Sequence, residues 1–368
     1  MSRIATFRYL PTPAFAVVIV CLLYVSMVLI SAGGDPLAFA TLGTRFAQGD
    51  PQGSEGYDGQ FAYQIALRPL GAAPYLDVPA YRYQRILYPM LARLLALGQP
   101  EAIPWTLILA NVAAIGLGTW ATGRLLLHFG VSRWYALSYG LYGGQLLALR
   151  TDLNEPWAQA LIQCAMLAWA KDRRSVAICA FGLAALTKET TVIFLAAYIL
   201  YSLKKRMWQS AIGLCAAALP FVMYQALLWA WLGTPGIGSG GANATPFSLV
   251  PLGGWLAIAQ LKVMAFLLIS LIVVPMSVLP AVVGIVLSLR DLHQGKDHPI
   301  TYSLLLNALV ILFLPASTFR EPAAMVRLTH GLSATTVVYG GLRRSTRILA
   351  YSMLWIATNV LLIKGVSM

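Results

Sequence analysis

Charged residues are scarce in this chain. Asp, Glu, Lys and Arg together make up 11% of its 368 residues, whereas an ordinary soluble domain contains about 25%. Hydrophobic residues make up 59% of the chain. Because a surface so poor in charge does not suit full exposure to water, the composition excludes a water-soluble globular protein. The sequence predicts a protein embedded in a lipid bilayer.

Cysteine and histidine are also few, with four residues of each. Cys21, Cys164, Cys179 and Cys215 lie singly in apolar runs without C-x-x-C spacing, which is typical of buried hydrophobic residues rather than of a disulfide or a metal site. Of the histidines, only His330 lies away from the basic loops. The glycine-rich segment GIGSGGANATP has no preceding strand and no Gly-Lys-Ser, which excludes a nucleotide-binding P-loop.

Acidic residues are half as numerous as basic ones, with 13 Asp and Glu against 26 Lys and Arg. In a membrane protein, Lys and Arg concentrate in the loops on the cytoplasmic side. The excess of positive charge therefore predicts an orientation in the membrane and contacts with membrane lipids, and no nucleic-acid partner.

Long apolar runs recur along the whole chain. A helix needs roughly 20 apolar residues to cross a bilayer. The predicted fold class is all-α: a polytopic membrane protein of about 11 transmembrane helices that form one transmembrane domain over residues 1–368. The runs cover residues 14–31, 102–127, 134–149, 156–170, 176–201, 209–231, 264–289, 301–317, 328–342 and 346–364.

The run at 176–201 is interrupted midway by the polar sequence Thr187-Lys188-Glu189-Thr190. One continuous helix would place a Lys and a Glu deep in lipid and would separate the basic clusters at its two ends. Two short helices keep both basic clusters on the same side of the membrane. The positive-inside rule favours the two short helices.

The distribution of charge supports this topology. With the N-terminus in the cytoplasm, 15 of the 26 basic residues and 3 of the 13 acidic residues fall at cytoplasmic ends of the predicted helices. The long first loop, residues 32–101, then lies on the outer face and is predicted to contain interfacial helices. Within it, AYRYQRILYPMLARLLALG places Arg82, Arg85 and Arg93 on one helical face, which either meets lipid headgroups or binds an anion, and Pro89 predicts a bend.

Two outer turns join helices that are too short for a full crossing. Helices of about 13 to 16 residues reach only about 20 to 24 Å, short of the roughly 30 Å hydrocarbon core, so these turns should lie recessed within the protein. The first turn carries Asp152, Asn154 and Glu155, and the second carries Lys188 and Glu189. A buried ionisable group needs a partner or a function. Lys188 and Glu189 therefore either pair to pin their hairpin or serve a ligand.

A third outer segment places Arg320 and Arg327 close to the membrane surface. Basic side chains can bind and stabilise a departing phosphate, and a carboxylate can take a proton from an incoming hydroxyl. The outer face thus suits a lipid-borne substrate that has a phosphate at the membrane surface and a sugar projecting outward.

Three motifs carry a resemblance to a known group. GYDGQFAYQIALRP, YRYQRILYP and FGLAALTKET, within about residues 56–200, resemble a bacterial group of polytopic proteins linked to cell-surface glycopolymer formation. That group is similar to the GT-C superfamily of glycosyltransferases, which use polyprenyl-phosphate-linked sugars.

The resemblance implies that Asp58, an acidic residue in the first outer loop, is the catalytic base, and Gly56 and Gly59 would allow the turn that projects it. Many relatives carry an Asp-x-Asp pair that is absent here, so metal dependence stays open and no cofactor is predicted. The predicted site residues are Lys188, Arg82, Arg85, Arg320 and Arg327 for the donor phosphate, and Tyr57, Gln60, Asp152, Asn154, Glu155 and Glu189 for the sugar or acceptor.

The expected function is transfer of a sugar from a polyprenyl-phosphate donor to a glycan, lipid or protein acceptor. The expected location is the bacterial inner membrane, with the active site on the periplasmic face. Two alternatives share this composition: a flippase or transporter of lipid-linked sugars, and a non-catalytic subunit of a surface-polysaccharide machine. A transporter should show inverted repeats, and the sequence shows no internal repeat.

Overall fold

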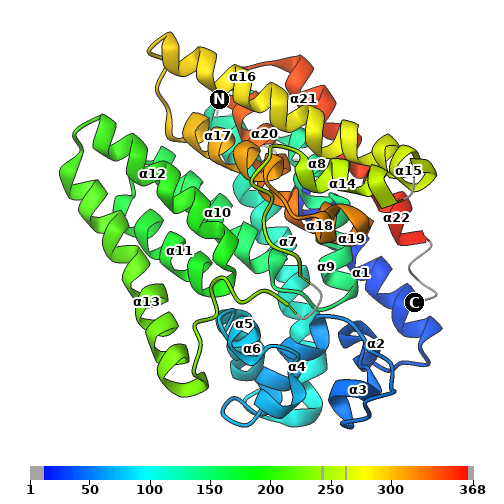
Figure 1. The fold of residues 1–368 in the computed structure, drawn as a ribbon. Helices are drawn as coiled ribbons and strands as arrows, with labels where there is room; N and C mark the ends of the chain where they lie inside the picture. The colour runs from blue at the N-terminus through cyan, green and yellow to red at the C-terminus, as the bar shows by residue number, and fades with distance from the viewer. Residues whose placement is uncertain (1–11, 242–243, 262, 364–368) are drawn as a thin grey trace, which may run out of the picture.

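The computed structural model describes residues 12–241, 244–261 and 263–363, and in these ranges every regular element is a helix. The all-α prediction is confirmed for this part of the chain. Arg3 and Arg8, whose charges contribute to the predicted orientation, lie outside the described residues. Figure 1 shows a bundle of helices with a group of short helices at one end.

Four helical stretches in the described ranges are long and apolar enough to cross a membrane. They match four of the predicted runs, at 14–31, 102–127, 209–231 and 264–289. The helices are α1 (Pro13–Ser31), α7 (Ile103–His128), α13 (Trp208–Leu232) and the joined pair α15 (Val263–Val273) and α16 (Leu279–His293), linked by a π-helical turn, η5 (Val274–Val278).

The other predicted spans are shorter or broken, so the total of about 11 crossings stays a prediction. The run at 134–149 is split into η3 (Arg133–Ala136), α8 (Leu137–Gly140) and α9 (Gly143–Arg150), and the run at 346–364 into α21 (Thr346–Ser352), η6 (Met353–Asn359) and α22 (Val360–Ile363). Single helices of 13 to 16 residues form the rest: α10 (Glu155–Ala170), α11 (Arg174–Thr187), α12 (Val192–Lys204), α17 (Pro299–Leu312) and α20 (His330–Leu342).

The stretch at 176–201 forms two helices, as predicted. α11 ends at Thr187, and α12 begins at Val192 after a short 3-10 turn, η4 (Glu189–Thr191). Lys188 has extended backbone angles, φ −158° and ψ 127°, which stop α11. The break therefore presents Lys188 and Glu189 at the tip of a helical hairpin.

Helix α10 forms the centre of the bundle. It packs against α7 and α11 and also contacts α9 and α20. Most of its side chains are buried, including its polar ones. A 16-residue helix enclosed by neighbours need not match the thickness of a bilayer, which explains how short helices are accommodated inside this fold.

The first loop folds as short helices that lie together at one end of the bundle (Figure 1). Arg93 does not line up with Arg82 and Arg85 on one continuous face, because the helix breaks at residues 84–86; its guanidinium donates to the carbonyls of Ala66 and Leu67 instead. The predicted bend at Pro89 is wrong: this proline lies in the first helical turn after the break, where a backbone N–H has no helical partner to lose. The helices of this loop are α2 (Leu37–Ala40), α3 (Thr44–Ala47), α4 (Gly59–Leu67), η1 (Ala73–Tyr75), α5 (Pro79–Tyr83), α6 (Leu87–Leu95) and η2 (Pro100–Ala102).

Three short helices come later in the chain: α14 (Gly253–Leu261), α18 (Ala316–Arg320) and α19 (Pro322–Leu328). The short helix α18 contacts both α14 and α19. Together with the first loop, α18 and α19 enclose a polar cavity.

Candidate active site

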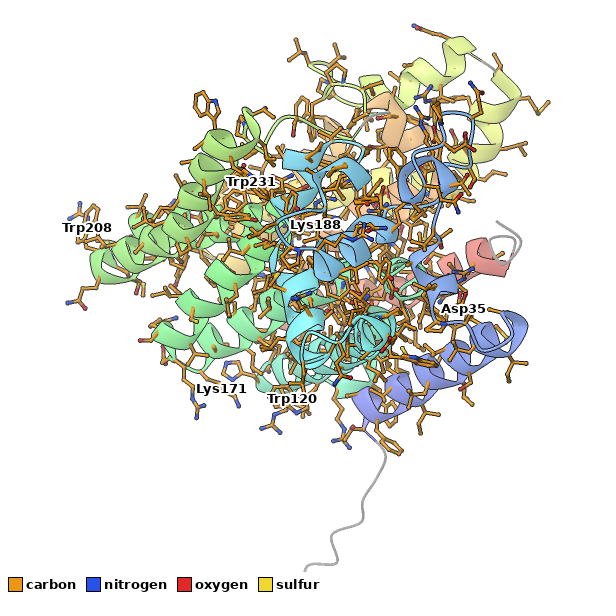
Figure 2. The ribbon with its side chains drawn as sticks, turned by 90° about the horizontal axis from the view of Figure 1, so that it is seen from below. Asp35, Trp120, Lys171, Lys188, Trp208 and Trp231 are labelled. Atoms are coloured by element: carbon orange, nitrogen blue, oxygen red, sulfur yellow. The ribbon has the colours of Figure 1, made fainter. Side chains whose placement is uncertain are left out.

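A cavity of about 640 Å³ lies between the first loop, η4, α18 and α19. In a view onto the end of the bundle formed by the first loop, Lys188 lies near the centre of the molecule and Trp208 at its periphery (Figure 2). The predicted site residues that line the cavity are Tyr57, Asp58, Gln60, Arg82, Arg85, Lys188, Glu189 and Arg327. The cavity thus brings together residues from four separate stretches of the chain.

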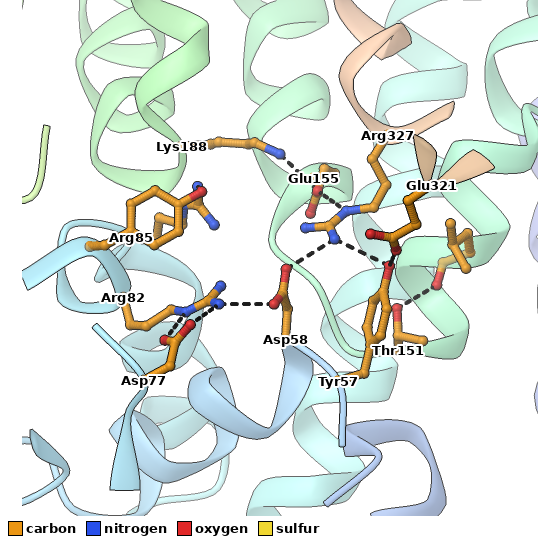
Figure 3. Close-up of polar contacts among 12 residues, drawn as sticks. Tyr57, Asp58, Asp77, Arg82, Arg85, Thr151, Glu155, Lys188, Glu321 and Arg327 are labelled. Atoms are coloured by element: carbon orange, nitrogen blue, oxygen red, sulfur yellow. Dashed lines mark hydrogen bonds and ion pairs between the residues drawn. The ribbon is translucent and has the colours of Figure 1, made fainter. Parts of the chain in front are cut away.

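Asp58 lies between two guanidinium groups. Arg82 Nη2 is 3.0 Å from its Oδ1, and Arg327 Nη1 donates to its Oδ2 at 3.0 Å (Figure 3). Burial would raise the pKa of this carboxyl, but the charges of Arg82, Arg327 and Arg85 outweigh burial and hold the pKa below its usual value. Asp58 is therefore ionised at neutral pH, and both of its oxygens are engaged.

Two glycines position Asp58, for different reasons. Gly56 has φ +68°, a left-handed conformation that suits glycine, and this turn directs the chain into α4. Gly59 has no such φ; a Cβ at this residue would come within 1.9 Å of the Thr151 carbonyl oxygen. Gly59 thus lets the backbone beside Asp58 pack directly against the turn that leads into α10.

We expect Gly59→Ala to destabilise the protein, because the added methyl group must push α4 away from Thr151. Overpacking of this kind costs roughly 1–3 kcal/mol. Thermal unfolding of the detergent-solubilised protein measures the effect, with Gly71→Ala as the control, since a Cβ there would meet only Arg68 Cβ at 3.9 Å. Equal unfolding temperatures for the two variants would contradict the packing argument.

Arg82 is held by a carboxylate that the sequence prediction missed. Its Nε and Nη2 donate to Asp77 Oδ1 and Oδ2, both at 2.7 Å, and its guanidinium lies 4.2 Å from the ring centre of Phe61. Bidentate pairing fixes the orientation of the guanidinium plane. Asp77 precedes Arg82 by five residues, a separation that carries no helical signal, so only the fold reveals this pair.

Glu155 holds two buried cations. Its Oε1 accepts from Lys188 Nζ and from Arg327 Nε, both at 2.7 Å, and the residue is 1% exposed. Glu155 does not line the cavity. It contacts two cations of the site, whereas the sequence predicted that it binds the sugar or the acceptor. Lys188 pairs with Glu155 on α10, and Glu189 pairs with another residue, which excludes the Lys188–Glu189 pair that was one of the two alternatives from the sequence.

Glu189 pairs with Arg85. The guanidinium donates from Nη2 to Oε1 at 2.6 Å and from Nε to Oε2 at 2.9 Å. Nη2 of Arg85 also contacts the Tyr81 hydroxyl at 2.6 Å. The pair joins the first loop to the tip of the α11–α12 hairpin, 104 residues away along the chain.

Tyr57 connects the first loop to α19. Its hydroxyl donates to Glu321 Oε1 and accepts from Arg327 Nη1, both at 3.3 Å. Burial raises the pKa of Tyr57 to about 12, despite the opposing charge of Arg327. The phenol therefore stays protonated and can donate a hydrogen bond. Glu321, which lines the same cavity, is a second residue that the sequence prediction missed.

Four predicted residues have other positions or contacts. The Asp152 carboxyl is fully buried without a hydrogen-bond partner, lines a separate cavity of about 30 Å³, and has a pKa that burial raises well above its usual value. Asn154 donates to the Thr187 carbonyl at 2.6 Å and lines the same small cavity.

Gln60 lines the large cavity, but its side chain accepts from the Gly43 N–H and donates to the Glu55 carbonyl. Arg320 is exposed and does not line either cavity.

No family model, no curated protein and no solved structure matches this chain. Within the described residues, no group of three or more His, Cys, Asp or Glu side chains is placed to hold a metal ion. The arrangement itself is an open polar cavity whose lining includes five carboxylates, two phenols and five cations: Glu55, Asp58, Asp77, Glu189, Glu321, Tyr57, Tyr81, Arg45, Arg82, Arg85, Lys188 and Arg327.

Proposed function

We propose that the chain is a membrane glycosyltransferase that moves a sugar from a polyprenyl-phosphate donor to an envelope glycan, lipid or protein on the periplasmic face of a bacterial inner membrane. The observation that carries this proposal is the position of Asp58, an ionised carboxylate on an open cavity between Arg82 and Arg327. The four long apolar helices support membrane insertion.

The cations suit the phosphate of the donor. Arg82, Arg85, Lys188 and Arg327 all line the cavity. Each already has a carboxylate partner, so the charges of these groups are largely balanced within the protein. A phosphate that enters can bind the guanidinium groups in bidentate fashion, in exchange for part of their contact with Asp58.

The proposed reaction is a single displacement at the anomeric carbon. The acceptor hydroxyl oxygen forms a bond to this carbon while the bond to the phosphate oxygen breaks, and the polyprenyl phosphate leaves with the electron pair. Asp58 takes the proton of the hydroxyl. Arg82, Arg327 and Lys188 stabilise the negative charge that develops on the leaving phosphate.

Donor binding also explains how Asp58 becomes an effective base. Arg82 and Arg327 contact both of its oxygens and lower its affinity for a proton. The donor phosphate competes for the same two guanidinium groups. Its binding therefore releases Asp58 and makes it more basic, which favours a sequence in which the donor binds before the acceptor reacts.

The pH dependence follows from the lowered pKa of Asp58 in the free protein. Only ionised Asp58 can accept a proton, and kcat/KM reports the groups of the free enzyme. Because an ordinary Asp has a pKa of about 3.9, we expect kcat/KM to show no acidic limb from Asp58 down to about pH 4. The acidic limb in kcat should lie at higher pH, because bound donor weakens the contacts of Asp58 with Arg82 and Arg327. An acidic limb in kcat/KM centred near pH 6 would assign the base to a carboxyl of raised pKa instead.

The direct test uses purified protein in lipid vesicles with a radiolabelled polyprenyl-phosphate sugar and a mixture of envelope acceptors. Transfer of label to an acceptor supports the glycosyltransferase. Movement of the intact donor between leaflets without transfer supports a flippase, and neither activity supports a non-catalytic subunit. Both of the latter results overturn the proposal.

A further inference from the structure

Buried polar side chains line one face of α10, in the centre of the bundle. Glu155, Gln159 and Gln163 are spaced four residues apart, which places them on the same face of the helix. All three residues are at most 5% exposed. At 1.5 Å per residue they extend about 12 Å along the helix, starting from the carboxylate that pairs with Lys188 and Arg327. Polar side chains therefore continue from the site into the bundle.

Side chains of neighbouring helices belong to the same polar region. Helices α7, α9 and α20 contact α10, α8 contacts α7 and α20, and these helices lie together in the middle of Figure 1. The charge of Glu155 acts on the His330 ring, whose centre is 5.8 Å from that of Tyr139. The Tyr139 hydroxyl lies near the Gln145 amide and against α7, since a Cβ on Gly118 would come within 2.1 Å of it.

Gln163 connects α10 to the same part of α7. Its Oε1 lies 3.2 Å from the Thr122 hydroxyl, which donates to the Gly118 carbonyl at 2.8 Å. Because the Tyr139 hydroxyl borders the same glycine, these groups form one cluster that extends from Glu155, beside the site, to Gln163 inside the bundle. We call it the core polar cluster: Tyr139, Gln145, Glu155, Gln159, Gln163 and His330.

Eight side-chain atoms of the core polar cluster have no hydrogen-bond partner among the described residues. The atoms are Tyr139 Oη, both amide atoms of Gln145, Glu155 Oε2, Gln159 Oε1, Gln163 Nε2 and both ring nitrogens of His330. Tyr139 and Gln145 lie near each other but form no hydrogen bond of ordinary geometry. Buried polar groups are nearly always hydrogen-bonded, either to protein or to ordered water. Eight unpaired atoms in one cluster are therefore more than a dry core accommodates.

We infer that the core polar cluster binds a short chain of ordered water molecules, which leads from Glu155 into the bundle. A buried water molecule makes about three hydrogen bonds, so eight atoms correspond to about three water molecules. Water between Glu155 Oε2 and His330 fixes the free oxygen of the carboxylate, whereas Lys188 and Arg327 bind the other oxygen. His330 is then a positioning residue that acts on these cations through water and Glu155. The inference does not depend on the proposed function.

Hydroxyl-radical footprinting by X-ray radiolysis tests the inference directly, because radicals formed from bound water react with the side chains beside it. The purified protein in detergent is irradiated, and mass spectrometry measures the labelling rate of each residue. Tyr139 and Tyr198 are both 1% exposed, but Tyr198 packs against the rings of Trp169 and Phe181. We expect Tyr139 and His330 to be labelled severalfold faster than Tyr198. Equally slow labelling of all three residues overturns the inference.

The substitution Gln145→Met distinguishes a hydrated cluster from a dry one. In a dry core it removes two unpaired polar atoms and raises the unfolding temperature; in a hydrated core it removes hydrogen bonds to water. We expect a lower unfolding temperature and slower labelling of Tyr139. Gln209→Met, the same change at an exposed position of α13, is the matched control and should alter neither. An unchanged or higher unfolding temperature of Gln145→Met, or unchanged labelling of Tyr139, overturns the inference.

Two substitutions of His330 test its positioning role. His330→Phe keeps a ring but removes both nitrogens, whereas His330→Gln can still bind water. We expect slower labelling of Tyr139 in the Phe variant and a rate near that of the wild type in the Gln variant. In a Glu155→Ala background, His330→Phe should lower the unfolding temperature less than in the wild type, because the water bridge is already broken. Equal shifts in both backgrounds, or equal labelling in the Phe and Gln variants, overturn the positioning role.

Discussion

Replacement of Asp58 by Asn is expected to lower kcat about 10²- to 10⁴-fold, the usual contribution of a general base. The amide is nearly the same size as the carboxylate but cannot take the proton of the acceptor. The fold should survive, because Arg82 keeps Asp77 and Arg327 keeps Glu155 as partners. Initial rates of transfer at saturating donor measure the loss.

A second result is expected for Asp58→Asn. In the proposed mechanism, Asp58 competes with the donor phosphate for Arg82 and Arg327, so its neutralisation should leave the donor affinity unchanged or increase it. Asp50→Asn is the control, since Asp50 is an exposed acid of the same loop that does not line the cavity. Full transfer by folded Asp58→Asn would refute its role as base, and weaker donor binding would refute the competition.

Replacement of Glu155 by Ala is expected to cause the largest loss of stability. Its removal leaves Lys188 and Arg327 buried without their shared counter-charge. Breaking a buried ion pair by removing one partner typically costs about 3–5 kcal/mol. The thermal unfolding temperature in detergent measures the loss. Addition of Lys188→Met should restore part of it, because Lys188 loses the carboxylate it pairs with, whereas Arg327 keeps Asp58 at 3.0 Å.

An exposed ion pair of similar length provides the control. Arg45 and Glu55 are 2.8 Å apart, against 2.7 Å for the two Glu155 contacts, but their side chains are 47% and 59% exposed. Exposed pairs contribute about 0–1 kcal/mol. Glu55→Ala should therefore change the unfolding temperature much less than Glu155→Ala. Equal effects of the two substitutions would show that burial does not decide the strength of the Glu155 contacts.

Local patterns predicted the parts of the site that depend on nearby residues. Polar residues in the middle of an apolar run located the break before Lys188, and a motif resemblance drew attention to Asp58 in the first loop. The pairing of these residues could not be predicted in the same way. Lys188 and Glu189 are adjacent and opposite in charge, yet each faces a different partner because the backbone turns between α11 and η4.

Residues that are close in the sequence were given the same predicted role, but the fold gives them different contacts. Asp152 and Glu155 are three residues apart, but the Glu155 carboxylate contacts two cations whereas the Asp152 carboxyl has no hydrogen-bond partner. Nothing in the sequence of that turn distinguishes them. Arg320 and Arg327 likewise belong to one predicted outer segment, but only Arg327 lines the cavity, because α18 and α19 orient them differently.

The sequence by itself determined the environment of this protein: its scarce charge and its four long apolar helices are properties of composition and local periodicity. Only the tertiary structure decided which charges meet. Asp58 and Arg327 are 269 residues apart along the chain, and no local spacing encodes such a contact. Burial then selects the partners, because a charged side chain inside the bundle is costly unless it pairs with an opposite charge or becomes neutral.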